Sequence, residues 1–277
     1  MNFLIIGAKG MLGHAMQEIF ADDNPTCWDV DDLDIANEGE VTKKIKDLEP
    51  RIIINCAAYT NVDKAEEEKD NAFKVNAIGV KNIVNIARLI NAIVIHYSTD
   101  YVFDGEKKEG YSEDDIPSNP INTYGVSKWH GEKELMSYDN HYLIRTSWLF
   151  GLHGKNFVQT IINLHQTQPE LKIVNDQFGK PTYTKDLALA TKDLLRGKAL
   201  FGTYHLVNEP ATNWYQFAKK IIELKYPQSK KTIIPVASKE FPRPAKRPHY
   251  STLLNTKRPL LRPWQEPLKE YLEKYPE

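Results

Sequence analysis

The sequence predicts an α/β fold in which a doubly wound parallel sheet is accompanied by a smaller α/β lobe. Short apolar runs alternate with segments of helical periodicity through the first 150 residues, a pattern typical of strands buried on both faces and joined by crossover helices. The first of these runs ends at a glycine-rich turn that opens a helix. With 277 residues, of which 41% are hydrophobic, the chain can bury a substantial core.

The N-terminal part divides into strands and helices in turn. The expected strands are short apolar runs, over 3–6, 27–30, 51–55, 92–98 and 142–145. Helices are expected over 11–20, 41–48, 72–90 and 122–136, and the first and third of these have apolar residues at helical spacing. Segment 103–120 interrupts the rhythm with glycines, prolines and charged residues. It predicts a long surface loop, of the kind that often forms a functional lid.

After residue 150 the alternation loosens and indicates a smaller lobe. Helices are expected over 157–164, 186–195 and 214–224, and short strands over 172–174 and 204–206. Prolines are dense from Pro235 onward, so irregular backbone is expected there. The expected main domain covers 1–150 plus roughly 184–200, and the expected smaller lobe covers roughly 151–183 and 201–277.

Composition excludes several classes of function. The net charge of −1 provides no basic excess for nucleic acid or an acidic membrane. Cys27 and Cys56 are too few for a disulfide framework, and both lie in apolar runs, so we expect buried thiols in a reducing compartment. The N-terminal apolar run lacks the basic flank of a signal peptide, and no apolar stretch approaches the roughly 18 residues that span a membrane. A soluble cytoplasmic protein is therefore expected.

The first strand, turn and helix predict a dinucleotide site. The turn has the spacing Gly-x-x-Gly-x-x-Gly. Glycines permit a tight turn and close approach of the backbone to a pyrophosphate, whose charge then faces a helix N-terminus. The residues expected to contact the cofactor here are Gly7, Lys9, Gly10, Met11, Leu12 and Gly13. A plain strand-to-helix turn is the alternative.

Acidic residues after the second strand bear on the choice of cofactor. Asp29 and Asp31 lie near the expected distance of about 20 residues past the glycines. A carboxylate there accepts from both ribose hydroxyls and disfavours a 2′-phosphate, which favours NADH, although Lys9 could reach the extra phosphate of NADPH. Asp34 and Ile35 are the other residues after the second strand that we expect to contact the cofactor. Because the aspartates form a run, a solvated acidic turn is the alternative.

Tyr124 and Lys128 form a pair with catalytic potential. They lie four apart, one turn from each other on one helical face, downstream of a strand that ends in Ser98-Thr99-Asp100. An ammonium beside a phenol lowers the tyrosine pKa from about 10, which would make a proton donor usable near neutral pH. The same spacing recurs at Tyr215/Lys219 and Tyr226/Lys230. An exposed helix pair is the alternative, and we favour it for these two copies.

With the glycine turn, Ser98-Thr99-Asp100 and Tyr124-x-x-x-Lys128 together, the chain resembles the extended short-chain dehydrogenase/reductases. The segments that narrow this resemblance are 55–66, 97–103, 145–148, 175–182 and 247–251. In this order they resemble the dTDP-4-dehydrorhamnose reductase family, over nearly the whole chain. The resemblance implies a Rossmann-type dinucleotide domain and a nucleotide-sugar-binding lobe. It also implies reduction of the C4 ketone of dTDP-4-dehydro-L-rhamnose to dTDP-L-rhamnose with NADPH or NADH.

The resemblance assigns the catalytic roles to Thr99, Tyr124 and Lys128. Tyr124 is the expected acid for the oxyanion at C4, and Thr99 is expected to orient the ketone oxygen. Lys128 is expected to hold the tyrosine pKa down and to contact the nicotinamide ribose, so that Tyr124 and Lys128 also count as cofactor contacts. The small residues expected to flank the nicotinamide are Ala57, Ala58 and Thr60. Tight strand–helix packing is the alternative for these three.

The expected substrate-binding residues include acids, aromatic residues and an arginine whose fork suits a diphosphate. They are Val62, Asp63, Thr99, Tyr101, Trp148, Asp176, Gln177, Thr182 and Arg247. A partly buried core tryptophan is the alternative for Trp148, and a solvated basic loop is the alternative for Arg247.

One departure from the family pattern concerns metal and assembly. Some members form a magnesium-linked dimer through a glutamate two residues after the third glycine, where this chain has Ala15. No metal is therefore expected, and a homodimer is unsupported.

Three other functions stay open: reduction of a different nucleotide-linked 4-ketosugar, an epimerase or dehydratase reaction that returns the hydride, and a non-catalytic regulatory role. The presence of Thr99, Tyr124 and Lys128 argues against the last.

Overall fold

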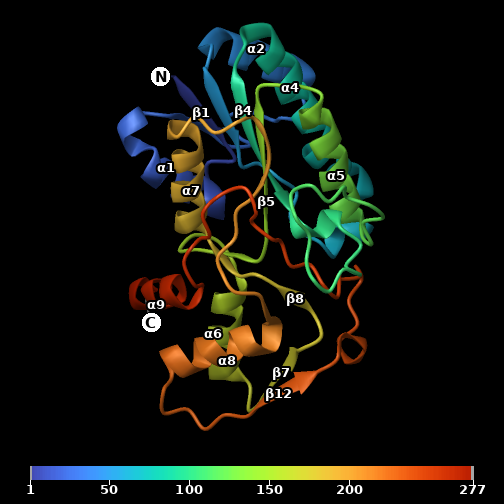
Figure 1. Ribbon diagram of the computed structural model, residues 1–277, viewed down its shortest axis with the longest axis vertical. Helices are drawn as coiled ribbons and strands as arrows, with labels where there is room; N and C mark the ends of the chain where they lie inside the picture. The colour runs from blue at the N-terminus through green and yellow to red at the C-terminus, as the bar shows by residue number, and fades with distance from the viewer. Residues whose placement is uncertain (1, 276–277) are drawn as a thin grey trace.

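A parallel six-stranded sheet organises residues 2–275, the part of the chain that the computed structural model describes (Figure 1). Its strand order is β10-β5-β4-β3-β1-β2, and every neighbouring pair runs parallel. The bounds are β1 Phe3–Ile6, β2 Thr26–Trp28, β3 Ile52–Asn55, β4 Ile93–Thr99, β5 His141–Thr146 and β10 Gly202–His205. The predicted doubly wound sheet is confirmed.

Helices cover both faces of the sheet because its strands are apolar on both sides. Phe3 and Ile5 belong to the core beneath α1 (Met11–Ile19) and α7 (Thr184–Arg196). Leu4 and Ile6 point the other way, into the core beneath α2 (Glu38–Leu48), α4 (Gly79–Ile90) and α5 (Thr123–Met136). Burying each such side chain contributes about 1.5–3 kcal/mol. The two apolar cores therefore fix the sheet between its helices.

The helix expected over 72–90 is interrupted. It consists of α3 (Lys69–Phe73), a π-helical turn over Lys74–Ile78 and α4. Within the π turn, the amide of Asn76 accepts from the N–H of Tyr59 at 2.9 Å and donates to the carbonyl of Tyr59 at 3.0 Å and to Ser127 Oγ at 3.0 Å. The widened turn thus joins the loop after β3 to α5. Such π-helical turns often occur at functional sites.

The smaller lobe is built on α6 (Phe157–Thr167) and α8 (Trp214–Lys225), with β7 (Leu171–Val174) parallel to β12 (Ile233–Val236). The remaining short strands are β6 Leu149–Phe150, β8 Phe178–Gly179, β9 Thr182–Tyr183 and β11 Thr212–Asn213. The 3₁₀ turns are η1 Ala21–Asp23, η2 Lys64–Glu66, η4 Asp100–Val102 and η5 Ser238–Glu240. Phe150, Phe217 and Tyr271 are among the aromatic residues of this lobe's core.

Two expectations about the C-terminal part were wrong. The proline-rich segment contains a further helix, α9 (Gln265–Lys274). Pro267 lies in its first turn, where a missing N–H costs no intrahelical hydrogen bond. In addition, β10 was assigned to the smaller lobe but pairs with β5 in the central sheet, with Gly202 opposite Tyr142. The division into two domains otherwise remains a prediction.

Among residues 2–275, no helix combines the length and apolarity that a membrane crossing requires.

Candidate active site

The carboxyl ends of β1, β3 and β4 meet at one edge of the sheet, where doubly wound folds bind ligands. A cavity of about 470 Å³ lies at this edge. The predicted cofactor residues that line it are Gly7, Lys9, Gly10, Asp29, Asp34, Ile35, Ala57 and Ala58. The lining residues that the sequence analysis missed are Ile6, Val30, Leu33, Cys56, Tyr59 and Val75. All six flank predicted residues or lie on the helices beside them, and this proximity was the signal in the sequence that could have identified them. Met11, Leu12, Gly13 and Thr60 do not line it.

The glycine turn is shaped by close backbone contacts. Gly7 has φ +76°, and a Cβ there would lie 2.5 Å from the N of Ala57. At Gly13 a Cβ would lie 2.1 Å from the carbonyl oxygen of Gly7. Gly10 is the N-cap of α1 and offers no side chain to cap it. The turn therefore presents backbone N–H groups at the start of a helix, an arrangement that suits a pyrophosphate.

The acidic turn after β2 is bonded to the glycine turn. The N–H of Lys9 donates to Asp29 Oδ2 at 2.7 Å, and the N–H of Val30 donates to Asp29 Oδ1 at 2.9 Å. Lys9 Nζ lies 2.6 Å from Asp31 Oδ2, and this hydrogen bond raises the lysine pKa. Asp29 therefore holds the loop in shape, and each of its oxygens retains a lone pair for a ribose hydroxyl.

Tyr124 lies in the first turn of α5, and three contacts fix the start of this helix. Asn122 Oδ1 caps it by accepting from the N–H of Gly125 at 2.8 Å. Glu66 accepts from the N–H and hydroxyl of Thr123 at 2.8 and 2.9 Å. A Cβ at Gly125 would lie 2.1 Å from the carbonyl oxygen of Tyr101. Only glycine permits this approach, which brings α5 against the turn that follows Thr99.

Thr99 and Asp100 are hydrogen-bonded to each other, and both influence the pKa of the nearby Tyr124 phenol. Thr99 Oγ1 donates to Asp100 Oδ1 at 3.0 Å and accepts from the N–H of Tyr101 at 3.2 Å. Burial raises the pKa of Tyr124 to about 12, while a hydrogen bond with Thr99 opposes this shift and the charge of Asp100 adds to it. The phenol is therefore protonated throughout the neutral range. Sequence reasoning gave Asp100 no role, although an acid directly after a strand-ending threonine was a signal.

The expected effect of Lys128 on the tyrosine pKa was wrong. Lys128 Nζ donates to the carbonyl of Tyr97 at 2.6 Å and lies 3.2 Å from His96 Nε2. His96 Nδ1 is in turn 3.0 Å from Asn55 Nδ2. Burial lowers the pKa of Lys128 to about 8. The ammonium is thus directed at β4, and desolvation, not a neighbouring cation, dominates the pKa of Tyr124.

Three of the expected substrate residues come together beside this group. Arg247 and Asp63 form a bidentate ion pair, with Nη2 at 2.9 Å from Oδ2. Arg247 also lies near the phenol of Tyr101, whose ring packs edge-on against Tyr124 at 6.0 Å between centroids. Val62 is half-buried in the same turn as Asp63. The C-terminal segment that carries Arg247 is therefore fastened to the catalytic edge.

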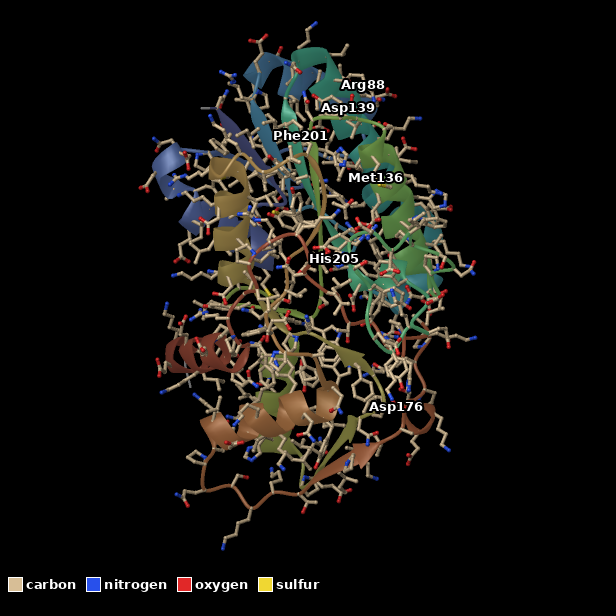
Figure 2. All side chains as sticks on the ribbon, viewed as in Figure 1. Arg88, Met136, Asp139, Asp176, Phe201 and His205 are labelled. Carbon is tan, nitrogen blue, oxygen red and sulfur yellow. The ribbon has the colours of Figure 1, made fainter. Side chains whose placement is uncertain are left out.

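The other expected substrate residues lie in the smaller lobe. Asp176 accepts from the N–H of Ser238 at 2.9 Å, and Gln177 Nε2 donates to Ser238 Oγ at 2.8 Å. Figure 2 shows Asp176 in this lobe, well below the labelled His205 of the sheet. Trp148 stacks on Trp214 at 3.5 Å between ring centroids, which supports the core alternative. Thr182 is fully buried in β9, so its position does not favour contact with a ligand.

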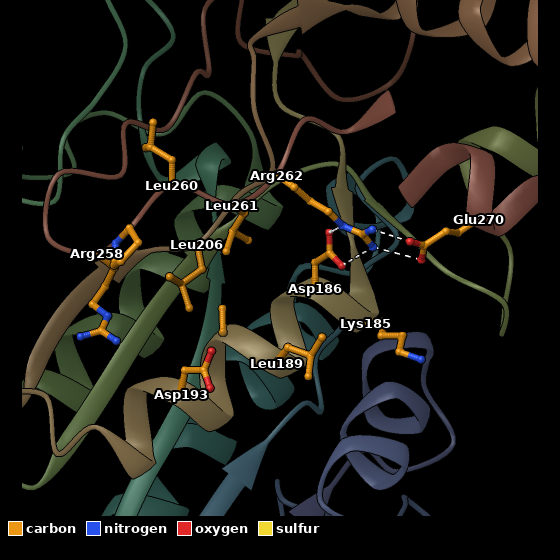
Figure 3. Close-up of a pocket in the computed structure, with 12 residues that line it drawn as sticks. Lys185, Asp186, Leu189, Asp193, Leu206, Arg258, Leu260, Leu261, Arg262 and Glu270 are labelled. Atoms are coloured by element: carbon orange, nitrogen blue, oxygen red, sulfur yellow. Dashed lines mark hydrogen bonds and ion pairs between the residues drawn. The ribbon is translucent and has the colours of Figure 1, made fainter. Parts of the chain in front are cut away.

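Figure 3 shows another cavity, of about 650 Å³, whose lining does not include Tyr124. It is bordered by α7, segment 258–262 and α9. Arg262 bonds Asp186 through Nε at 2.9 Å and Nη2 at 2.8 Å, and also pairs with Glu270. Among residues 2–275, no group of three or more His, Cys, Asp or Glu side chains is placed to hold a metal ion.

A glycine turn at the carboxyl edge of the sheet, together with buried Thr99, half-buried Tyr124 and Lys128 one turn along the same helix, is the arrangement of a dinucleotide-dependent oxidoreductase of the extended short-chain type. Comparisons with known proteins identify the family. The family model described as RmlD substrate binding domain matches residues 1–276. The chain therefore belongs to the dTDP-4-dehydrorhamnose reductase (RmlD) family, and the predicted resemblance is confirmed.

Individual relatives agree with this assignment. The dTDP-4-dehydrorhamnose reductase of Aggregatibacter actinomycetemcomitans is 38% identical over 92% of this chain and 91% of its own. A crystal structure of the dTDP-4-dehydrorhamnose reductase of Clostridium acetobutylicum is 43% identical and covers 99% of both chains with a TM-score of 0.93. The Bacillus anthracis enzyme, solved in complex with NADP, is 38% identical with the same coverage and TM-score.

Proposed function

We propose that this protein reduces the C4 ketone of dTDP-4-dehydro-L-rhamnose to dTDP-L-rhamnose, with NADPH or NADH as the reductant. The observation that carries the proposal is the placement of Thr99, at the end of β4, near Tyr124, at the start of α5, at the same carboxyl edge of the sheet as the glycine turn. The names of the relatives support the substrate, and the NADP complex of the Bacillus anthracis relative supports the cofactor.

The glycine turn fits a dinucleotide, because Gly7 and Gly13 leave no room for a Cβ and the start of α1 lacks a side-chain cap. We assign Gly7, Gly10 and the adjacent N–H groups to the pyrophosphate, and Asp29 with Lys9 to the adenosine ribose. Ala57 and Ala58 would line the path toward the nicotinamide. When bound, the reduced nicotinamide supplies the hydride.

Tyr124 acts as the general acid in this proposal. Its phenol is protonated at neutral pH because burial holds its pKa near 12. A sugar alkoxide is a stronger base than a phenolate, so the proton moves from Tyr124 to the developing oxyanion. Proton transfer from a positioned side chain contributes about 10²–10⁴-fold to a rate. Lys128, anchored on the carbonyl of Tyr97, holds α5 in place and keeps positive charge near this centre.

We assign the substrate to the side where Asp63, Tyr101 and Arg247 meet; the guanidinium of Arg247, which pairs with Asp63 in this structure, would turn to the diphosphate when the substrate binds. An arginine fork matches phosphate oxygens in a bidentate manner. The smaller lobe is proposed to hold the nucleotide part of the substrate.

We further propose a cytoplasmic location, since a chain with two cysteines suits a reducing compartment.

The test is incubation of the purified protein with dTDP-4-dehydrorhamnose and either reduced cofactor. We expect stoichiometric loss of the reduced-cofactor absorbance and an NMR spectrum of dTDP-L-rhamnose. A talose-type product would overturn the stereochemical assignment. Product formation without net cofactor oxidation would instead identify an epimerase or dehydratase.

A further inference from the structure

We propose that Tyr111 is a positioning residue for the substrate: its phenol oxygen shapes the turn 104–107, and this turn sets where the C-terminal segment places Arg247. This role rests on the proposed function and adds to it a residue that acts on the substrate only through Arg247. Tyr111 is 5% exposed, and its ring stacks on Phe103 at 4.1 Å between centroids. The stack ties Tyr111 to the end of β4, because Phe103 directly follows η4.

Three consecutive backbone N–H groups converge on the phenol oxygen of Tyr111. Gly105, Glu106 and Lys107 donate to it at 3.0, 3.0 and 3.1 Å. Successive N–H groups of this kind form a concave site that favours an anion. The phenol suits this site because it donates its own proton to Asp104 Oδ1 at 2.5 Å, and a hydrogen bond to a carboxylate concentrates negative charge on the phenol oxygen. The turn is therefore folded around one atom.

The turn contacts the C-terminal segment immediately after Arg247. Gly105 has φ +85°, and a Cβ there would lie 2.5 Å from the Cβ of Pro248. The carbonyl of Gly105 also accepts from the N–H of Tyr250 at 2.9 Å. Glycine adopts this left-handed conformation without strain and permits the close approach. The shape of the turn consequently fixes the position of Pro248.

Tyr111 holds the residues further along the same segment through its own backbone. Its N–H donates to the carbonyl of Thr252 at 2.8 Å, and its carbonyl accepts from the N–H of Leu254 at 2.7 Å. These two bonds do not involve the phenol oxygen. A variant that lacks only this oxygen therefore keeps the backbone pairing and releases the turn.

Before Arg247 the segment is fastened to the catalytic edge itself. Asn122 Nδ2 donates to the carbonyl of Lys246 at 2.8 Å, while Oδ1 of the same amide caps α5. The N–H of Ala245 donates to Asp63 Oδ1 at 3.2 Å. Arg247 is thus held between two attachments, and the attachment that follows it depends on the turn.

Tyr111→Phe tests this role, because it removes the phenol oxygen and preserves the ring stack. We expect KM for dTDP-4-dehydrorhamnose to rise by about 10-fold, the low end for a hydrogen bond to a charged group, because Arg247 is displaced from the diphosphate. We expect kcat to be nearly unchanged, since a loss of ground-state binding raises KM without lowering kcat. The affinity for dTDP, measured by calorimetry, should fall by the same factor, and the affinity for the reduced cofactor should not change.

A double-mutant cycle shows whether the effect passes through Arg247. Arg247→Met alone should weaken dTDP binding, and the addition of Tyr111→Phe should weaken it no further. Gly105→Ala reaches the same contact from the other side, because its Cβ displaces Pro248 while the phenol oxygen of Tyr111 stays. We expect this variant also to raise KM and to retain kcat.

Tyr138→Phe is the matched control. The phenol of Tyr138 is buried and donates to the carbonyl of Ala92 at 2.7 Å. Its removal should lower stability in denaturant titration without changing KM or the affinity for dTDP. The comparison separates positioning of the substrate from a general loss of stability.

The role of Tyr111 is overturned if Tyr111→Phe binds dTDP as tightly as wild type, or if its effect adds in full to that of Arg247→Met. It is equally overturned if kcat falls while KM stays the same, or if Tyr138→Phe raises KM as much as Tyr111→Phe does. Calorimetry with dTDP requires no turnover. A wild-type protein that binds dTDP but does not reduce dTDP-4-dehydrorhamnose therefore contradicts the proposed function alone, whereas one that binds no dTDP contradicts both.

Discussion

At the scale of single residues, burial decides the protonation state of Tyr124, the proposed general acid. The four-residue spacing of Tyr124 and Lys128 predicted their shared helical face, but it could not predict where the lysine would be directed. That direction depends on β4, where the carbonyl of Tyr97 accepts a hydrogen bond from the ammonium. The sequence therefore placed Tyr124 and Lys128 on one helical face but predicted a lowered tyrosine pKa, whereas burial raises it.

Replacing Tyr124 with phenylalanine removes the phenolic proton while preserving the ring. We expect kcat to fall by about 10²–10⁴-fold, with cofactor affinity, measured by fluorescence titration, nearly unchanged. Tyr226→Phe is the matched control, since Tyr226 has the same spacing to a lysine but bonds Gln166 in the smaller lobe. Activity that survives in Tyr124→Phe would remove the tyrosine from the mechanism.

Buried Lys128 should make stability depend on pH. Its pKa is lowered from 10.5 to about 8 in the folded state, so between these values the unfolded chain holds a proton that the folded chain has released. The free energy of unfolding should therefore rise with pH across this window because of Lys128. Urea unfolding of wild type and Lys128→Met from pH 7 to 10.5 should show a steeper rise for wild type. The exposed Lys81→Met should behave as wild type, and equal slopes in all three would contradict the assignment.

At the scale of elements, α5 is held to the sheet by charge as well as by apolar packing. Glu132 bonds Arg145 of β5 through Nε at 3.0 Å and Nη2 at 2.8 Å, and both side chains are almost completely buried. The guanidinium also lies over the ring of Phe103 at 5.1 Å. This pair fixes the helix that carries Tyr124 relative to the strand beside Thr99.

Glu132→Gln should leave the charge of Arg145 buried without its partner. We expect a loss of about 3–5 kcal/mol in the free energy of unfolding, measured by denaturant titration. Glu134→Gln, two residues along the same helix and partly exposed, should change stability by no more than about 0.5 kcal/mol. A similar small effect at Glu132 would mean that the pair is solvated in solution.

Element positions could be predicted where periodicity is strong, and less well where long-range contacts decide. The strand around Ile53 and the helix around Met16 follow from apolar spacing alone. The π turn at Asn76 could not be anticipated, because it depends on bonds to Tyr59 and Ser127, residues distant in sequence. Helix α9 was missed because prolines were taken as breakers, whereas Pro267 is tolerated in a first turn.

At the scale of the whole molecule, the C-terminal segment fastens the two lobes together. Asp63 and Arg247 form one such link near the catalytic edge, and Arg262 forms another by bonding Asp186 of α7 and Glu270 of α9 (Figure 3). The glycine turn at the edge of the sheet was predictable from its motif. The ion pairs that hold the C-terminal segment were not, since they join residues separated by up to 184 positions.

Arg262→Met should weaken the second link. Asp186 is 7% exposed and would lose its cation, while Arg262 itself is about a third exposed. We therefore expect a loss of about 2–3 kcal/mol, less than for a fully buried pair, measured as a lowered denaturant midpoint. Arg258→Met, whose side chain makes no ion pair within residues 2–275, should stay close to wild type. Equal midpoints for the two variants would refute the role of Arg262.

The position of β10 at the edge of the sheet has a consequence for synthesis on the ribosome. β5 ends at residue 146 and its outer partner ends at residue 205, an interval of 59 residues. At roughly 5–20 residues per second, the nascent chain spends about 3–12 seconds with the outer edge of β5 unpaired. Such an edge is a template for pairing with another chain. Newly made molecules should thus be most prone to aggregate, and most dependent on chaperones, during this interval.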